Sequence, residues 1–261
     1  MAQDSMMRVS LLSVTPVKGL ALHHPAYIDV SATGVSGDRA MFLVTESGEL
    51  ISCTDIGELM CHRAEYDPVT GLLEVRGPSG LLRSAIVELG EQLDTDFHGR
   101  REVSGHVAIG WSTLFSDIAR RPVRLVVGTA GGFDVAGLTL LGSSSVDALA
   151  ARNATDSIDG RRFRMNVEVS GTQPQDEDSW NGRKLHLGEA VVQVGGPVKR
   201  CAATTRNPDS GVVDLQTLRM IGAYRGRQDT AEFGKGFYFG VYAEVVVPGR
   251  VHTGDAVALV G

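Results

Sequence analysis

Short apolar runs separated by turn residues recur along the whole chain and predict a protein built mainly from β-strands. Two pairs of runs flank short loops and predict hairpins, one from residues 40–45 and 50–52, the other within residues 65–76. Single strands are expected at residues 9–14, 26–30, 86–89, 123–127, 138–141 and 191–194. Residues 97–104 are polar, and their pattern assigns them to no element.

Two stretches have helical character instead. Residues 111–121, WSTLFSDIARR, place apolar side chains at i, i+3, i+4 and i+7, and Pro122 follows where the helix should end. A second helix is expected to start near Val146, with the preceding serines as N-caps. A helix start rich in hydroxyl groups can also hold an anion, but ordinary capping is the favoured interpretation of this motif taken by itself.

Composition and charge narrow the class of protein. The chain has 261 residues, 43% of them hydrophobic, which suits a globular protein of one large or two small domains. A net charge of −6 argues against a nucleic-acid partner. Three cysteines, no apolar leader and no apolar window of about 18 residues predict a cytoplasmic protein without a membrane partner. Cys53 and Cys61 are interpreted as packing residues, because their spacing fits no zinc motif.

The segment GGPVKRCAATTRNPDSG, residues 195–211, holds the most distinctive chemistry. Cys201 follows two cations, Lys199 and Arg200, which stabilise the thiolate over the thiol. An Asn-Pro-Asp-Ser-Gly turn signal closes the segment, and the apolar run before it places Cys201 just beyond a strand end. A structural cysteine in a small-residue loop is the alternative interpretation of the same residues.

The segment KRCAATTRNPDSG, followed by LRMIGAYRG, resembles the MOSC family, the domains related to the C-terminal part of molybdenum cofactor sulfurase. The resemblance also covers RRFRMNVEVS at residues 161–170, a D-x-W-x-G element ending at Gly182, and closing-strand motifs near the C-terminus. It implies a mainly β fold with α-helices (α+β). Residues 1–127 would form an N-terminal β-barrel subdomain and residues 128–261 a C-terminal MOSC β-barrel with flanking helices, the two sharing a cleft.

The resemblance also implies a site. In that family the cysteine is the functional thiol, which ligates molybdenum in the reductase branch, so Cys201 is expected to be both catalytic residue and metal ligand. The residues expected to hold the molybdenum–molybdopterin cofactor are Lys18, Arg39, Ser144, Ser145, Arg164, Asn166, Arg200, Thr204, Tyr224 and Arg225. Gly19 stands where the family usually has a small hydroxyl residue, so that contact is either lost or supplied by a backbone N–H.

The arginine-rich stretch at residues 161–170 supports this expectation from its own pattern. Read as an extended strand, it places Arg164 and Asn166 on one side and Phe163, Met165 and Val167 on the other. Three arginines within four residues would repel one another unless an anion lies nearby. We therefore expect a pocket-lining strand rather than a solvated edge strand.

Three functions follow as hypotheses. The first is a molybdopterin-binding oxidoreductase that reduces an N-hydroxylated or N-oxide small-molecule substrate, with electrons from a separate reductase, because no ferredoxin-type cysteine motif is present. The second is a metal-free sulfur-transfer or C–S bond-processing enzyme, in which Cys201 acts as nucleophile or carries a persulfide. The third, a non-catalytic cofactor carrier, is favoured by no feature of the sequence.

Overall fold

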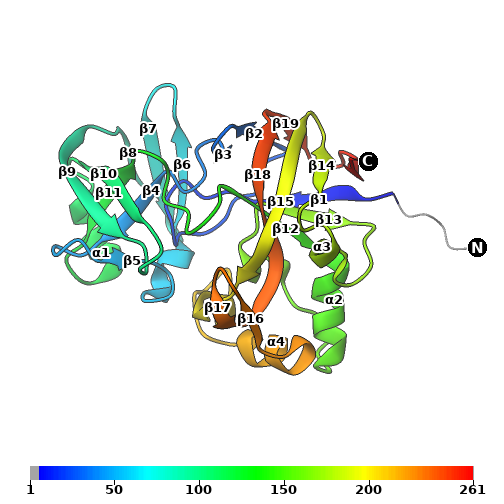
Figure 1. The fold of residues 1–261 in the computed structure, drawn as a ribbon. Coiled ribbons are helices and arrows are strands. Elements are labelled where there is room, and N and C mark those ends of the chain that lie inside the picture. Colours follow the sequence, from blue (N-terminus) through cyan, green and yellow to red (C-terminus); the bar gives the residue numbers. More distant parts are fainter. Residues whose placement is uncertain (1–5, 261) are drawn as a thin grey trace, which may run out of the picture.

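The computed structural model describes residues 6–260, which form two β-rich lobes side by side (Figure 1). Strands outnumber helices, so the predicted mainly β class with some α is confirmed. No helix within residues 6–260 has the length and apolar character needed to cross a membrane. Residues 1–5, which belong to the stretch expected to contain no apolar leader, and Gly261 lie outside the described part.

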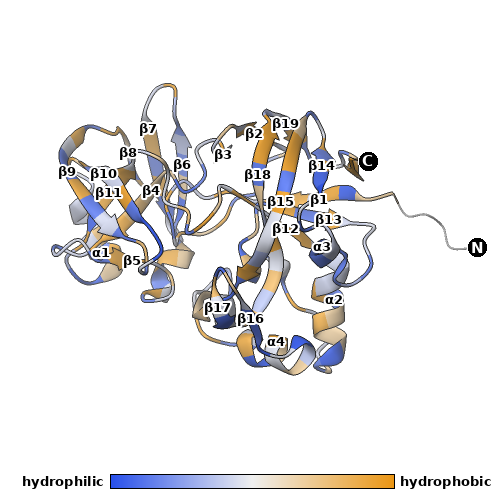
Figure 2. Ribbon diagram, in the orientation of Figure 1, coloured by the Kyte–Doolittle hydropathy of each residue, from blue (hydrophilic) through white to orange (hydrophobic). Residues whose placement is uncertain are grey.

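A seven-stranded, nearly closed, barrel-like sheet forms the core of one lobe. Its strands run in the order β1 (Arg8–Leu12), β13 (Val167–Ser170), β12 (Leu138–Gly142), β18 (Tyr238–Val247), β15 (Ala190–Lys199), β14 (Lys184–Leu187) and β20 (Val257–Leu259). Apolar residues dominate β12, β15 and β18, as Figure 2 shows, and the side chains of Leu140, Val192 and Val241 meet inside one core cluster.

The other lobe combines two smaller sheets and one helix. The five-stranded sheet has the order β5 (Leu50–Ile51), β4 (Met41–Val44), β11 (Arg124–Gly128), β10 (Glu102–Ala108) and β9 (Leu89–Asp96), beside the meander β6 (Arg63–Asp67), β7 (Leu72–Gly77) and β8 (Gly80–Ile86). The predicted helix is confirmed as α1 (Ser112–Ala119), which buries Phe115 and Ile118 against these strands. Both predicted hairpins are confirmed as well.

One prediction about this lobe fails, and one stretch that the pattern assigned to no element proves to be ordered. The strand expected at residues 86–89 is instead the junction between β8 and β9. The unassigned residues 97–104 close a hairpin between β9 and β10, where Phe97 is fully buried against Phe42. The hairpin is marked by turn contacts at Gly99 rather than by hydrophobic alternation, which explains why the pattern missed it.

The start of the chain belongs by its pairing to the sheets of the C-terminal half. β1 pairs with β13, and β2 (Tyr27–Ser31) lies between β3 (Gly34–Val35) and β19 (Gly249–His252). The chain therefore passes from the C-terminal lobe into the N-terminal lobe after residue 35 and returns through residues 129–137. The division into units at residues 127 and 128 stays a prediction.

Helices cover one end of the seven-stranded sheet. α2 (Ser143–Arg152) and α4 (Thr217–Arg225) lie together near the short α3 (Asp176–Ser179) and the hairpin of β16 (Gln228–Thr230) and β17 (Gly234–Gly236) (Figure 1). Leu149 of α2 and Ile221 of α4 share a core cluster with Phe239 of β18. Gly142 is the N-cap of α2 and no side chain caps it, so the predicted serine N-cap is wrong.

Candidate functional site

A cavity of about 390 Å³ lies between the two lobes and is lined from both. The N-terminal lobe and its approach strand contribute Lys18, Gly19, Arg39, Ser52, Cys53, Thr54, His98 and Arg100. The C-terminal lobe contributes Thr139, residues 162–166, residues 198–201, Ala203, Thr204 and Tyr242, and the connecting segment contributes Phe133, Asp134 and Ala136. The predicted shared cleft therefore contains seven of the predicted site residues: Cys201, Lys18, Arg39, Arg164, Asn166, Arg200 and Thr204.

Cys201 is exposed at the rim of this cavity, just beyond the end of β15, as predicted. It is the N-cap of the 3₁₀ helix Ala202–Thr205. The Thr204 hydroxyl donates to the Cys201 carbonyl oxygen at 3.0 Å and lies 2.7 Å from the Thr217 hydroxyl. Thr204 thus fixes the backbone of Cys201 and leaves the thiol facing the cavity.

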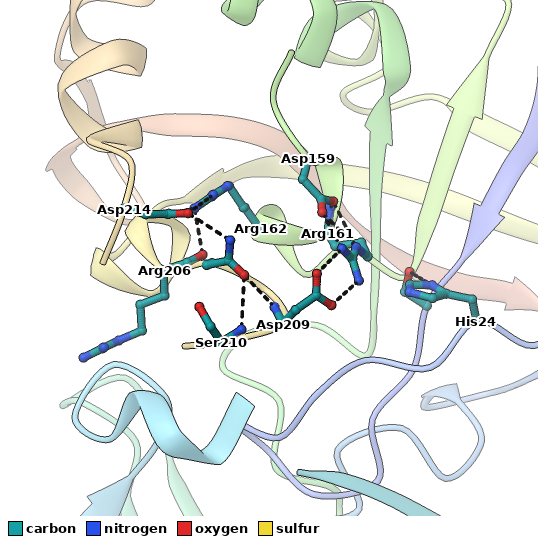
Figure 3. Close-up of polar contacts among 10 residues, drawn as sticks. His24, Asp159, Arg161, Arg162, Arg206, Asp209, Ser210 and Asp214 are labelled. Atoms are coloured by element: carbon teal, nitrogen blue, oxygen red, sulfur yellow. Dashed lines mark hydrogen bonds and ion pairs between the residues drawn. The ribbon is translucent and has the colours of Figure 1, made fainter. Parts of the chain in front are cut away.

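Ion pairs clamp the loop that follows Cys201 onto the C-terminal lobe (Figure 3). The Arg161 guanidinium makes two hydrogen bonds of 2.8 Å to the Asp209 carboxylate and also binds Asp159. The Arg162 guanidinium donates to the Arg206 carbonyl oxygen at 2.9 Å and pairs with Asp214 at 2.7 Å. Bidentate pairs of this kind fix geometry as well as adding energy, so the two arginines set the position of the cysteine loop.

Acid is expected to loosen this clamp. The hydrogen bond from Arg162 lowers the pKa of Asp214 below its usual 3.8, and the one from Arg161 does the same for Asp209. A lowered native pKa contributes stability above the unfolded pKa and loses it as the pH falls through the native value. The melting temperature of the wild type should therefore fall more steeply between about pH 4 and about pH 2 than that of Asp214→Asn. Asp229→Asn, on the exposed β16, is the control and should follow the wild type.

A close backbone contact ties the cysteine loop to the N-terminal lobe. A Cβ added to Gly211 would lie 1.9 Å from the Gly57 carbonyl oxygen. The Arg206 guanidinium completes the contact by donating to the Gly211 carbonyl oxygen at 2.8 Å and the Thr54 carbonyl oxygen at 3.0 Å. The cavity therefore depends on a glycine that sits where two lobes meet.

Replacing Gly211 by alanine should lower the free energy of unfolding by about 2–4 kcal/mol, because backbone strain and a backbone collision add together. Gly211 has φ +68°, a conformation that costs a side chain about 1 kcal/mol even in open space. Gly182→Ala separates the two costs, because Gly182 has φ +77° but open space around it. Equal losses in the two variants, measured by urea denaturation, would show that the collision with Gly57 is absent.

Two guanidinium groups at the inner end of the cavity have no carboxylate partner among the described residues. Arg200 donates to the Phe163 carbonyl oxygen at 2.8 Å, to the Phe239 carbonyl oxygen and to the Met165 sulfur. Arg164 donates to the Leu20 carbonyl oxygen at 2.6 Å. Burial lowers the pKa of Arg200 to about 10 and also lowers that of Arg164. Positive charge held in this way is stabilised by an anion in the cavity.

The other two cations that the resemblance assigns to this cavity, Lys18 and Arg39, are held by acids. Lys18 donates to Asp134 at 2.9 Å and to the Gly132 carbonyl oxygen at 3.1 Å, and burial lowers its pKa despite the carboxylate. Arg39 pairs with Asp38 and donates to the Arg164 carbonyl oxygen at 2.8 Å. Asn166 donates to Asp38 at 2.8 Å, so its amide positions the Asp38–Arg39 pair from beneath the cavity.

The stretch at residues 161–166 is not the extended strand that its pattern predicts. Residues Gly160–Phe163 form a 3₁₀ helix, Arg164 has φ 52°, and β13 starts only at Val167. Phe163 and Met165 pack into a buried core cluster, as expected, but they also line the cavity beside Arg164 and Asn166. The turn directs Arg161 and Arg162 to the cysteine loop, while Arg162 and Arg164 also line the cavity.

The remaining four predicted cofactor contacts do not line the cavity. Ser144 bonds the Thr172 hydroxyl at 2.6 Å, and Ser145 donates to the buried Glu177 carboxylate at 2.8 Å. The Tyr224 hydroxyl accepts from Gln175 at 2.6 Å, and Arg225 pairs with Asp178. These contacts join α2 and α4 to the segment of α3, which gives the four side chains a place in the packing of that end of the lobe.

Several cavity residues escaped the sequence reasoning. Cys53 lines the cavity and is not only a packing residue, while His98 and Arg100 reach it from the β9–β10 hairpin. Asp134 lies in the segment of residues 129–137 through which the chain returns to the C-terminal lobe. A side chain at Gly19 would meet the Cys53 backbone nitrogen at 2.8 Å, so the departure from a hydroxyl residue there follows from this close approach.

Comparisons with known proteins agree with this architecture. Residues 129–258 match the model of the MOSC domain family. The chain is 26% identical over 240 residues to the molybdenum cofactor sulfurase of Oryza sativa subsp. japonica, covering 77% of this chain and 29% of that protein. It is 30% identical over 131 residues to mitochondrial amidoxime-reducing component 1 of Mus musculus, covering 49% of this chain and 38% of that protein.

Longer matches also exist. The mitochondrial amidoxime-reducing component 1 of Xenopus laevis is 27% identical over an alignment of 293 positions, gaps included. This alignment covers 95% of this chain and 81% of that protein. The crystal structure of the YUAD protein from Bacillus subtilis superposes with a TM-score of 0.47 at 14% identity, covering 97% of this chain and 95% of that chain. The chain thus spans about a third of the rice and mouse relatives and most of the frog relative.

Proposed function

This chain belongs to the MOSC domain family through residues 129–258, and from that membership we propose that its cavity binds the molybdenum cofactor with Cys201 as the thiolate ligand of the metal. The observation that supports the proposal is that an exposed thiol and two guanidinium groups, those of Arg164 and Arg200, line the same cavity. The two guanidinium groups donate to carbonyl oxygens and a thioether sulfur instead of carboxylates. A phosphate on the pterin side of the cofactor would supply the missing negative charge.

The donors present fit such a group. Thiolate sulfur is a preferred ligand of soft metal centres, and guanidinium forks match the oxygen atoms of a phosphate. Arg200 and Arg164 would bind the phosphate, with Lys18 and Arg39 beside them. Among residues 6–260 no cluster of three or more His, Cys, Asp or Glu side chains is arranged around a metal. Cys201 is accordingly the protein ligand that we assign.

When bound, the cofactor supplies two-electron chemistry that removes oxygen from an N-hydroxylated or N-oxide substrate. The protein's part is positioning. Thr204 holds the Cys201 backbone, Asn166 orients the Asp38–Arg39 pair, and Asp134 keeps the Lys18 ammonium at the cavity wall. A separate reductase would deliver the electrons. The names of the mouse and frog relatives, amidoxime-reducing components, support this reaction class for the chain.

A second function has support from the same thiol. The rice relative is named molybdenum cofactor sulfurase, and cations around an exposed cysteine also stabilise a persulfide anion. In this alternative the chain is a metal-free sulfur-transfer or C–S bond-processing enzyme, and the anion in the cavity belongs to the substrate. Such an enzyme would need no cofactor and would carry only a persulfide on Cys201.

Purification from a host supplied with molybdate distinguishes the two functions. The first predicts molybdenum and pterin in near-equal amounts with the protein, and reduction of an amidoxime when a reductase is added. The second predicts metal-free protein with a persulfide mass adduct on Cys201. Protein that contains neither molybdenum nor a persulfide would overturn both proposals.

A further inference from the structure

A second thiol reaches the cavity that holds Cys201, and the proposed function gives it no role. Cys53 lies in the turn that follows β5, where the backbone nitrogen atoms of Asp55 and Ile56 donate to the Ser52 carbonyl oxygen. Its residue is 3% exposed, yet its side chain lines the same cavity as the exposed Cys201. One reactive space between the lobes therefore contains one accessible and one protected thiol.

The turn that carries Cys53 and the loop that carries Cys201 are joined at three points. Cys53 packs with Met60 against Ala203, which is two residues beyond Cys201. The hydroxyl of Thr54, next in sequence to Cys53, lies 3.9 Å from the Cys201 sulfur. The Arg206 guanidinium donates to the Thr54 carbonyl oxygen at 3.0 Å. These contacts hold the two cysteine-bearing segments against each other across the lobe boundary.

Arg164 lines the same cavity as the two cysteines and donates to the Leu20 carbonyl oxygen at 2.6 Å rather than to a carboxylate. A guanidinium without a carboxylate partner is available to a thiolate, and thiolates are the species that attack oxidised sulfur.

We propose that Cys53 and Cys201 form a redox-active thiol pair, in which Cys53 resolves Cys201 after a hydroperoxide has oxidised it. The exposed Cys201 thiolate attacks a peroxide oxygen, the O–O bond breaks, and a sulfenic acid and a hydroxide or alkoxide result. The Cys53 thiolate then attacks the Cys201 sulfur, the S–O bond breaks, and the departing hydroxide takes up a proton as water. The disulfide has lost two electrons in total, and an added dithiol restores both thiols.

The pair would protect Cys201 from irreversible oxidation to a sulfinic acid, and would remove its sulfur from metal binding while the disulfide lasts. The inference goes beyond the proposed function, because its chemistry needs only the two cysteines and a peroxide. It holds for either occupant of the cavity.

Cys61 provides a matched control. It lines a different cavity, of about 190 Å³, and its thiol donates to the Ser210 carbonyl oxygen at 3.3 Å. Burial raises its pKa, which reduces its thiolate fraction and its reactivity. Cys61→Ser should therefore leave the formation of the disulfide unchanged.

Peptide mapping of metal-free wild-type protein tests the pair. The protein is treated with limiting hydrogen peroxide, its remaining thiols are alkylated in denaturant, and it is cleaved after glutamate, which separates Cys53 from Cys61 at Glu58. We expect the monomer to yield a peptide in which Cys53 and Cys201 are cross-linked, and we expect dithiothreitol to abolish this cross-link. The proposal would be overturned if Cys53 is recovered alkylated while Cys201 carries a sulfinic acid or an intermolecular disulfide.

The variants Cys53→Ser and Cys53→Ala add a second readout. Each should lose the cross-link and accumulate sulfinic acid at Cys201 under the same treatment, while Cys61→Ser behaves as the wild type. Circular dichroism checks that each variant is folded. If neither variant is folded, the peptide map of the wild type alone decides whether the Cys53–Cys201 disulfide forms. Cys53 variants that are folded and no more prone to sulfinic acid than the wild type would contradict a resolving role.

Discussion

The double variant Arg164→Met, Arg200→Met is expected to lose the anionic cofactor while keeping its fold. Each guanidinium would make charge-assisted hydrogen bonds worth roughly 1.5–3 kcal/mol to a phosphate, so each single variant should bind about 10- to 100-fold more weakly. Methionine fills similar space without charge. Molybdenum and pterin content after gel filtration measure the loss, and both should fall to background in the double variant.

Stability separates this binding role from a structural one. Burial lowers the pKa of both arginines, so the folded protein pays for their charge when the cavity holds no anion. The cofactor-free double variant should therefore melt no lower than cofactor-free wild type. Arg219→Met, on the exposed face of α4, is the control and should retain the cofactor. A double variant that retains full cofactor, or that simply unfolds while single variants bind normally, would argue for structural arginines.

Replacement of Cys201 by serine is the second substitution with a large expected effect. Thr204 holds the backbone of the exposed Cys201, which lines the cavity, and a serine at this position preserves that geometry. Serine oxygen is neither a soft ligand nor a thiolate nucleophile, so turnover of an amidoxime should fall by roughly 10³-fold or more. Cys61→Ser, whose sulfur lies outside this cavity, should retain activity.

Circular dichroism and the melting temperature should be the same in Cys201→Ser and the wild type, each measured without cofactor, because the exposed sulfur contributes little packing. Under the sulfur-transfer alternative the variant also loses activity, but the wild type then contains no metal to lose. A serine variant with undiminished turnover would exclude Cys201 from the chemistry under both functions.

Local signals in the sequence predicted much of this molecule. The helical face at Trp111, Phe115 and Ile118 became α1, and paired apolar runs became hairpins, because period and turn chemistry act over a few residues. Cys201 was placed correctly beyond a strand for the same reason. Seven of the eleven residues that the family resemblance marks, Lys18 and Arg200 among them, meet at one cavity.

The failures concern geometry that a local pattern does not carry. Alternation at residues 161–170 suggested a strand, but the ion pairs of Arg161 and Arg162 with the distant Asp209 and Asp214 favour a 3₁₀ turn. Ser145 was expected at the cofactor, yet the buried Glu177 takes its hydroxyl. No sequence motif marks Cys53 as a cavity residue, because it contacts the Cys201 loop only when the two lobes pack together.

The most direct test of the central claim is X-ray absorption at the molybdenum edge, recorded on the wild type and on Cys201→Ser at equal protein concentration. In the wild type we predict a molybdenum signal whose fit includes a sulfur scatterer from Cys201. In the serine variant we predict that this scatterer is lost or that the molybdenum signal disappears altogether. Wild-type protein without molybdenum, or a serine variant with the same metal content and the same sulfur shell, would contradict ligation by Cys201.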